Sequence, residues 1–164
     1  MRNTEARAIA LGGVMAALAM VIMCLGGLIP VATFVCPMIC MMILRLICRL
    51  CGSRIAWAWY GVVAILSLLL GPDKEAAAVF LFLGYYPLLK PWVDGRKLPW
   101  LWKLLLFNAA IGIMYAVLIR LFGMAELARE YAELGRIVTA LMLVLGNVCF
   151  FLLDLCMTRF SNRK

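Results

Sequence analysis

The stretch ARAIALGGVMAALAMVIM, Ala6–Met23, decides the fold class. Arg7 is its only charged residue, and the rest is apolar or glycine. About 20 consecutive apolar residues are what an α-helix needs to cross the hydrocarbon core of a bilayer. A cleaved secretory signal would instead lead through a small-residue cleavage site into a polar mature domain, and no such domain follows. We interpret the stretch as a retained membrane span.

The rest of the chain repeats this pattern. Its 164 residues are 67% hydrophobic, whereas soluble domains are about 45–50% apolar. The excess comes in blocks of roughly membrane length. We therefore predict an all-α integral membrane protein, a bundle of six transmembrane helices forming a single domain over residues 1–164. The predicted spans are Ala8–Ile29, Val31–Cys48, Arg54–Leu70, Ala76–Lys90, Leu101–Phe122 and Ile137–Met157.

The turn GPDKEA between the third and fourth spans has clear helix-boundary residues. Gly71 is suited to end a helix, while Pro72, Asp73 and Glu75 are typical of the first turn of the next one.

Charge predicts the orientation, because cytoplasmic loops carry an excess of Lys and Arg. Twelve of the sixteen basic residues fall on one side in the six-span arrangement, namely Arg2, Arg7, Arg45, Arg49, Arg54, Lys90, Arg96, Lys97, Lys103, Arg159, Arg163 and Lys164. Both termini and Arg96 are thus expected in the cytoplasm, and residues 126–136 outside. We predict a multi-pass protein of the plasma membrane. Its net charge of +8 reflects topology and affinity for anionic headgroups, not nucleic-acid binding.

Most motifs of enzymes are missing from the sequence, and a carboxylate mechanism through Asp73, Glu75 and Asp154 at the membrane boundaries is the alternative that its residues leave open. It has no Gly-x-x-x-x-Gly-Lys-Ser/Thr loop for ATP, no Gly-x-Ser-x-Gly elbow and no histidine. Cys48 and Cys51 have the spacing of a metal or redox pair, but no second pair completes a tetrahedral site. We interpret the seven cysteines as small packing residues. We predict no catalytic residue, no metal site and no cofactor, and expect that the protein is not an enzyme.

Polar residues within the spans must face the protein interior or a cavity. A subset in the predicted outer halves or the outer turn, with one near mid-membrane, forms our candidate substrate site: Thr33, Ser67, Asp73, Glu75, Tyr115 and Asn147. The alternative is that these residues only make hydrogen bonds between helices.

Asp154 lies near the cytoplasmic end of the sixth span, at the depth of Arg45 and Arg49 and close to Arg159. We expect it to form an ion pair that holds helix ends together. The alternative is contact with a partner protein at the inner face.

The segment MAELAREYAELGR, residues 124–136, is predicted to be an amphipathic helix on the outer surface. Leu127, Tyr131 and Leu134 share one face of it. It is either a connector or a lid over an outer pocket.

The opening stretch has a second property, a wide face of small residues. Gly12, Gly13, Ala16 and Ala17 lie on it, and small residues four apart let another helix backbone approach closely. We predict that these four residues dock a separate membrane protein. The alternative is packing against a neighbouring helix of the same chain.

This small-residue stripe, together with six short spans, both ends inside and no ATP site, resembles the substrate-binding S components of energy-coupling factor (ECF) importers. The resemblance implies a membrane coupling subunit and separate ATPases as partners, and a vitamin or similar micronutrient as substrate. The chain departs from this family in two ways. Many S components close their pocket with a long loop between the first two helices, whereas Leu28–Val31 is only a turn here. Nickel and cobalt members use an N-terminal histidine, and this sequence has no histidine, which argues against a metal substrate. The alternative from another class is a non-transporting membrane scaffold or assembly subunit.

Overall fold

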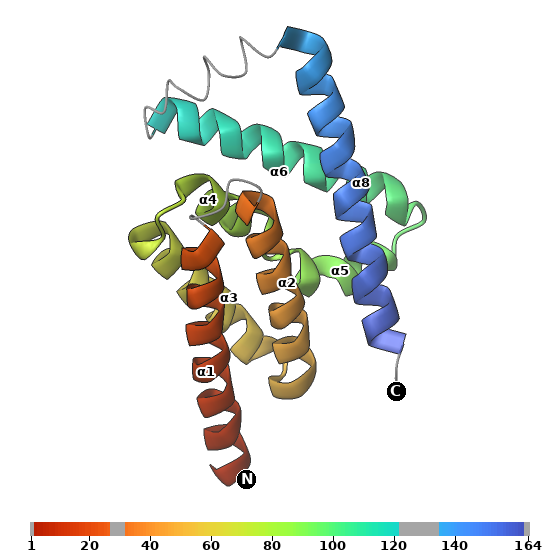
Figure 1. The fold of residues 1–164 in the computed structure, drawn as a ribbon. Coiled ribbons are helices and arrows are strands. Elements are labelled where there is room, and N and C mark those ends of the chain that lie inside the picture. Colours follow the sequence, from red (N-terminus) through yellow and green to blue (C-terminus); the bar gives the residue numbers. More distant parts are fainter. Residues whose placement is uncertain (1, 27–31, 122–134, 163–164) are drawn as a thin grey trace. The chain divides into compact units, whose positions relative to one another are not determined.

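The structure is a computed structural model that describes residues 2–26, 32–121 and 135–162. All secondary structure in these ranges is helical, with no strand, as predicted for an all-α protein. The helices, drawn in Figure 1, are α1 (Arg2–Gly26), α2 (Ala32–Cys51), α3 (Ser53–Leu70), α4 (Lys74–Leu83), α5 (Tyr86–Asp94), α6 (Pro99–Leu121) and α8 (Gly135–Asn162). The predicted amphipathic segment falls mostly outside the described residues, and only its last two residues lie in α8.

Six stretches of the described helices are long and apolar enough to cross a membrane: Ala6–Gly26, Thr33–Cys51, Ser53–Leu70, Lys74–Asp94, Pro99–Arg120 and Ala140–Arg159. This confirms the six-span, multi-pass reading of the sequence. The orientation of the termini and the identity of the membrane stay predictions.

The fourth span differs in detail from the single helix expected over Ala76–Lys90. It consists of two helices, α4 and α5, interrupted at Gly84 and Tyr85. Pro87 explains the interruption, because a proline ring clashes with the carbonyl four residues earlier and has no N–H to donate to it. Proline is well tolerated in the first turn of a helix, and that is its position in α5.

The described chain divides into two compact units, Met1–Arg96 and Lys97–Lys164. The first contains α1 to α5, and the second contains α6 and α8. The single-domain prediction for residues 1–164 is not tested by this division.

The first unit is built around α2, which contacts α1, α3, α4 and α5. Its fully buried side chains include Leu44 and Ile47 of α2, Val63 of α3 and Phe80 of α4. α4 is buried along the continuous run Ala76–Phe80. The three alanines in this run let neighbouring helices approach its backbone closely, so α4 lies in the interior of the unit.

The second unit packs α6 against α8. The rings of Phe107 and Phe150 lie with centroids 5.0 Å apart across this contact. A Cβ added at Gly146 would lie only 3.2 Å from Phe107 Cζ. Gly146 therefore gives α8 the room to approach the aromatic side of α6.

Candidate functional site

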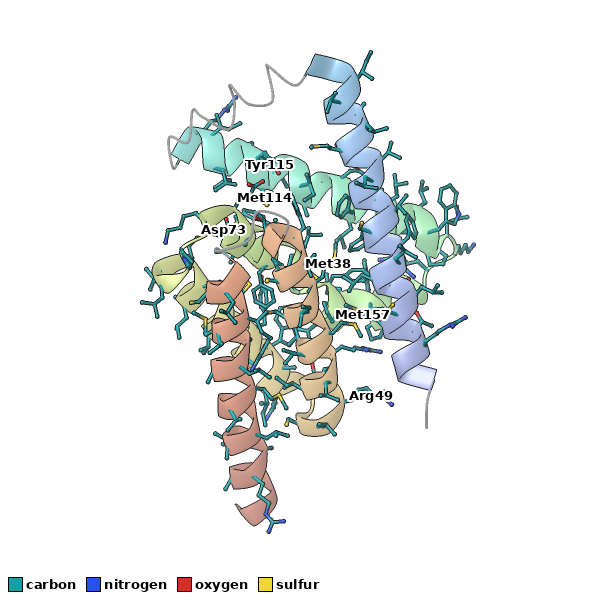
Figure 2. The ribbon with its side chains drawn as sticks, in the orientation of Figure 1. Met38, Arg49, Asp73, Met114, Tyr115 and Met157 are labelled. Atoms are coloured by element: carbon teal, nitrogen blue, oxygen red, sulfur yellow. The ribbon has the colours of Figure 1, made fainter. Side chains whose placement is uncertain are left out.

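Asp73 organises a polar cluster at the start of α4, and Figure 2 labels it there. One carboxylate oxygen, Oδ1, accepts hydrogen bonds from the backbone N–H groups of Glu75 (2.9 Å) and Ala76 (3.0 Å). The other, Oδ2, accepts from Thr33 Oγ1 of α2 at 2.7 Å. Asp73 is thus the N-cap of α4, as the GPDKEA turn predicts. Its charge also complements the positive end of the helix dipole.

Lys74, at the start of α4, binds the end of the preceding helix α3 across the same turn. Its Nζ donates to the carbonyls of Leu68 (2.9 Å) and Gly71 (3.0 Å), which are at the C-terminal end of α3. A Cβ at Gly71 would collide with the Ser67 carbonyl, so the turn requires glycine there. We call Thr33, Asp73, Lys74 and Glu75 the cap cluster, because their side chains or backbone groups join the ends of α2, α3 and α4.

Ser67, the fourth predicted substrate residue of the first unit, lies in the last turn of α3 and is fully buried. Its hydroxyl donates back to the carbonyl of Ala64 at 3.0 Å. This is the local bond that serine commonly makes within a helix. The structure therefore brings Thr33, Asp73 and Glu75 together and turns the Ser67 hydroxyl onto its own helix.

Tyr115 and Asn147 lie in the second unit, on α6 and α8. Asn147 and Asn108 exchange amide hydrogen bonds of 3.1 and 3.3 Å across the two helices. Each amide also donates to the carbonyl four residues earlier on its own helix, at 2.8 Å. Tyr115 is half-buried two turns further along α6. The six predicted substrate residues are thus divided between the two units.

Lys103 is the partner of Asp154. Lys103 Nζ lies 2.7 Å from Asp154 Oδ2, and both residues are only 8% exposed. The expected ion pair exists, and Lys103 of α6, which the sequence analysis does not name as a partner, provides a cation for it. A periodic pattern could have identified Lys103, since it shares the buried face of α6 with Phe107, Ala110, Met114 and Leu118.

The small-residue face of α1 divides into two parts. Gly12 is buried, and a Cβ added to it would lie 3.6 Å from Ile55 Cγ2 of α3. Gly13 and Ala17 are exposed, and none of the residues that the structure describes lies within 4 Å of a Cβ added at Gly13. Ala16 is half-buried between these two parts. Packing within the first unit therefore uses Gly12, while Gly13 and Ala17 present an open strip.

A shallow groove of about 420 Å³ runs along α8, lined by Val148, Phe151, Leu152, Asp154 and Leu155. Its lining is apolar except for Asp154, and it includes none of the six predicted substrate residues. Within the described ranges no group of three or more Cys, Asp or Glu side chains is placed to hold a metal ion.

The polar groups with hydrogen bonds described here are carboxylate, amide, hydroxyl and ammonium groups. The open strip on α1 is a separate packing surface of small residues. Comparisons with protein-family models, curated proteins and solved structures gave no match to this chain.

Proposed function

We propose that the protein is the membrane-embedded substrate-binding subunit of an ECF-type importer. The observation that carries the proposal is the open strip of α1, at Gly13 and Ala17. Lipid provides no hydrophobic drive between helices, so association depends on close backbone packing, which small residues allow. Gly12 already meets Ile55, but a partner helix can still reach the other side of α1.

The proposed partners are those that the resemblance to ECF S components implies, namely a membrane coupling subunit and separate ATPases. The absence of a P-loop motif from these 164 residues is consistent with ATP hydrolysis by separate subunits. The coupling subunit is the occupant proposed for the strip.

The substrate is proposed to be a small polar micronutrient that binds at the cap cluster. This cluster contains a carboxylate, a hydroxyl and an ammonium group at one end of the first unit. A ligand would bind there by exchanging hydrogen bonds with groups such as Thr33 Oγ1, which lies on a different helix from Asp73.

A second candidate function is that of a non-transporting scaffold, and the hydrogen bonds that the predicted substrate residues make within the protein favour it. Both carboxylate oxygens of Asp73 and the hydroxyl of Ser67 already have protein partners. In that case the cap cluster only joins helix ends, and the strip on α1 binds a permanent partner.

Thr33→Val separates the two candidates. If the importer proposal is correct, the variant loses a hydrogen-bond donor of the substrate site, and binding weakens by about 1–3 kcal/mol. Small molecules released from the purified protein are identified by mass spectrometry, and their occupancy is compared between variant and wild type. Thr158→Val is the matched control, since Thr158 Oγ1 donates only within α8, to the Asp154 carbonyl at 2.8 Å. A Thr33→Val protein that loses stability, with no bound molecule in either form, supports the scaffold.

The orientation is tested at two exposed turn positions, Pro72 before α4 and Gly95 after α5. Single cysteines are introduced there in a background without the seven native cysteines. A membrane-impermeant maleimide added to intact cells is expected to label position 72 and to spare position 95, because the basic residues gather on the side of Arg96. Labelling of position 95 alone would reverse the orientation and place the cap cluster in the cytoplasm.

A further inference from the structure

The interruption of the fourth span leaves backbone carbonyls that the helix itself does not satisfy. A regular helix would pair Leu81 O with the N–H of Tyr85, but Gly84 and Tyr85 form a turn between α4 and α5, although both keep right-handed helical backbone angles. It would likewise pair Pro87 O with residue 91, which is a proline and has no N–H. An unsatisfied carbonyl inside a bilayer is strongly unfavourable, because no water is available to replace the lost donor.

Side chains of two neighbouring helices supply the missing donors. Tyr60 Oη, from α3, donates to Leu81 O at the end of α4. Arg45 Nη1, from α2, donates to Pro87 O in the first turn of α5 at 3.2 Å. The interruption thus has one external hydrogen bond on each side of it.

The two halves of the span are held differently by the rest of the first unit. α4 is buried all round over Ala76–Phe80. α5 buries Tyr86, Pro87, Lys90 and Val93, and its exposed residues, Pro91, Trp92 and Asp94, lie in its C-terminal half. α4 is therefore fixed by its surroundings, whereas the C-terminal half of α5 is held from one side.

We propose that the interruption is a hinge, with α4 as its fixed half and α5 as its movable half, and that the hydrogen bond from Arg45 to Pro87 O holds α5 in the position seen here. Arg45 is then a positioning residue. A guanidinium on a long side chain suits this role, because it can release one carbonyl without deforming the backbone of α2. Gly84 keeps the turn tight, since an added Cβ would collide with the Phe80 carbonyl.

Tryptophans provide reporters on both sides of the hinge. Trp92 lies on α5 and is 52% exposed, while Trp59 lies on α3 and is 4% exposed. The full chain is labelled with fluorotryptophan, and the five resonances are assigned by single Trp→Phe changes. Exchange between two positions of α5 on the microsecond-to-millisecond timescale broadens or splits the Trp92 line.

Arg45→Met removes the donor and keeps an unbranched apolar stem in place of the inner part of the arginine side chain. It is expected to broaden or split the Trp92 line and to leave the Trp59 line sharp. Arg49→Met, one turn along α2 at an exposed position, is the control and is expected to change neither line. Pro91→Leu restores a backbone N–H opposite Pro87 O, so the double variant Arg45→Met/Pro91→Leu is expected to return to the line width of Pro91→Leu alone.

A sharp single Trp92 line in Arg45→Met would overturn the proposal. So would broadening of Trp59 together with Trp92, which means that the whole unit has loosened. Failure of Pro91→Leu to restore the line would also overturn it, because Arg45 would then act through something other than the Pro87 carbonyl.

Discussion

Replacing Asp154 with leucine is expected to lower the free energy of unfolding by about 3–5 kcal/mol, because the Lys103 ammonium would remain in the interior without its carboxylate. The 2.7 Å contact is buried on both sides, so solvent screens it little. Unfolding is followed by adding SDS to the protein in mixed micelles, and the midpoints of variant and wild type are compared.

The double variant Lys103→Met/Asp154→Leu tests whether Asp154→Leu lowers the free energy of unfolding through the unpaired charge or through the change in side-chain shape. Replacing both members of a buried ion pair by apolar residues of similar volume is often neutral or stabilising, by about 1–4 kcal/mol. We therefore expect the double variant to recover the stability that Asp154→Leu loses. Lys97→Met, at an exposed position of the same unit, serves as the control for loss of one positive charge. Equal instability of the single and double variants would contradict the ion-pair account.

Gly13→Leu is expected to abolish co-purification with a coupling subunit while the isolated protein stays folded. No described residue lies within 4 Å of a Cβ at this position, so the larger side chain fits against the described part of the chain without strain. A partner helix packed on the strip would be held away by the leucine and would lose the close contact that drives association. Pull-down from membranes and thermal unfolding of the isolated protein measure the two effects separately.

Gly12→Leu is the matched comparison, one residue away on the same helix. Its added atoms extend toward the half-buried Ile55 of α3, and overpacking of this kind costs about 1–3 kcal/mol. Gly112→Leu, at an exposed glycine of α6, controls for a leucine in open space away from α1. If Gly13→Leu lowers the unfolding temperature as much as Gly12→Leu in the absence of a partner, the strip is internal packing and the importer proposal loses its main support.

The helical layout could be predicted because its determinants are local in the sequence. Long apolar blocks give the spans, and Gly71 and Asp73 end α3 and begin α4 as expected. The interruption of the fourth span also has a local cause, in Gly84, Pro87 and Pro91, but the apolar composition of that span concealed it. Hydropathy reports the cost of leaving water and says nothing about the continuity of the backbone.

The polar contacts could be predicted only in part, because depth in the membrane does not determine which helices are neighbours. Asp154 was expected to meet a cation, but its partner Lys103 is 51 residues away and was counted among the loop charges. Thr33 and Asp73 were both expected at the outer end, whereas their direct bond depends on α2 packing against α4. The open and closed sides of the α1 face, at Gly13 and Gly12, likewise depend on where α3 lies.

The burial of α4 also matters for how the protein is made. Its span, Lys74–Asp94, has the lowest mean hydropathy of the six and the largest buried share. Alone in a bilayer it would partition less favourably than its neighbours, since its alanines and terminal charges gain little from lipid. The ribosome synthesises α1, α2 and α3 first, and these are the helices that α4 packs against. Because of this order, the least hydrophobic span can pack against α1, α2 and α3 as soon as it is synthesised, and it does not have to be stable in lipid alone.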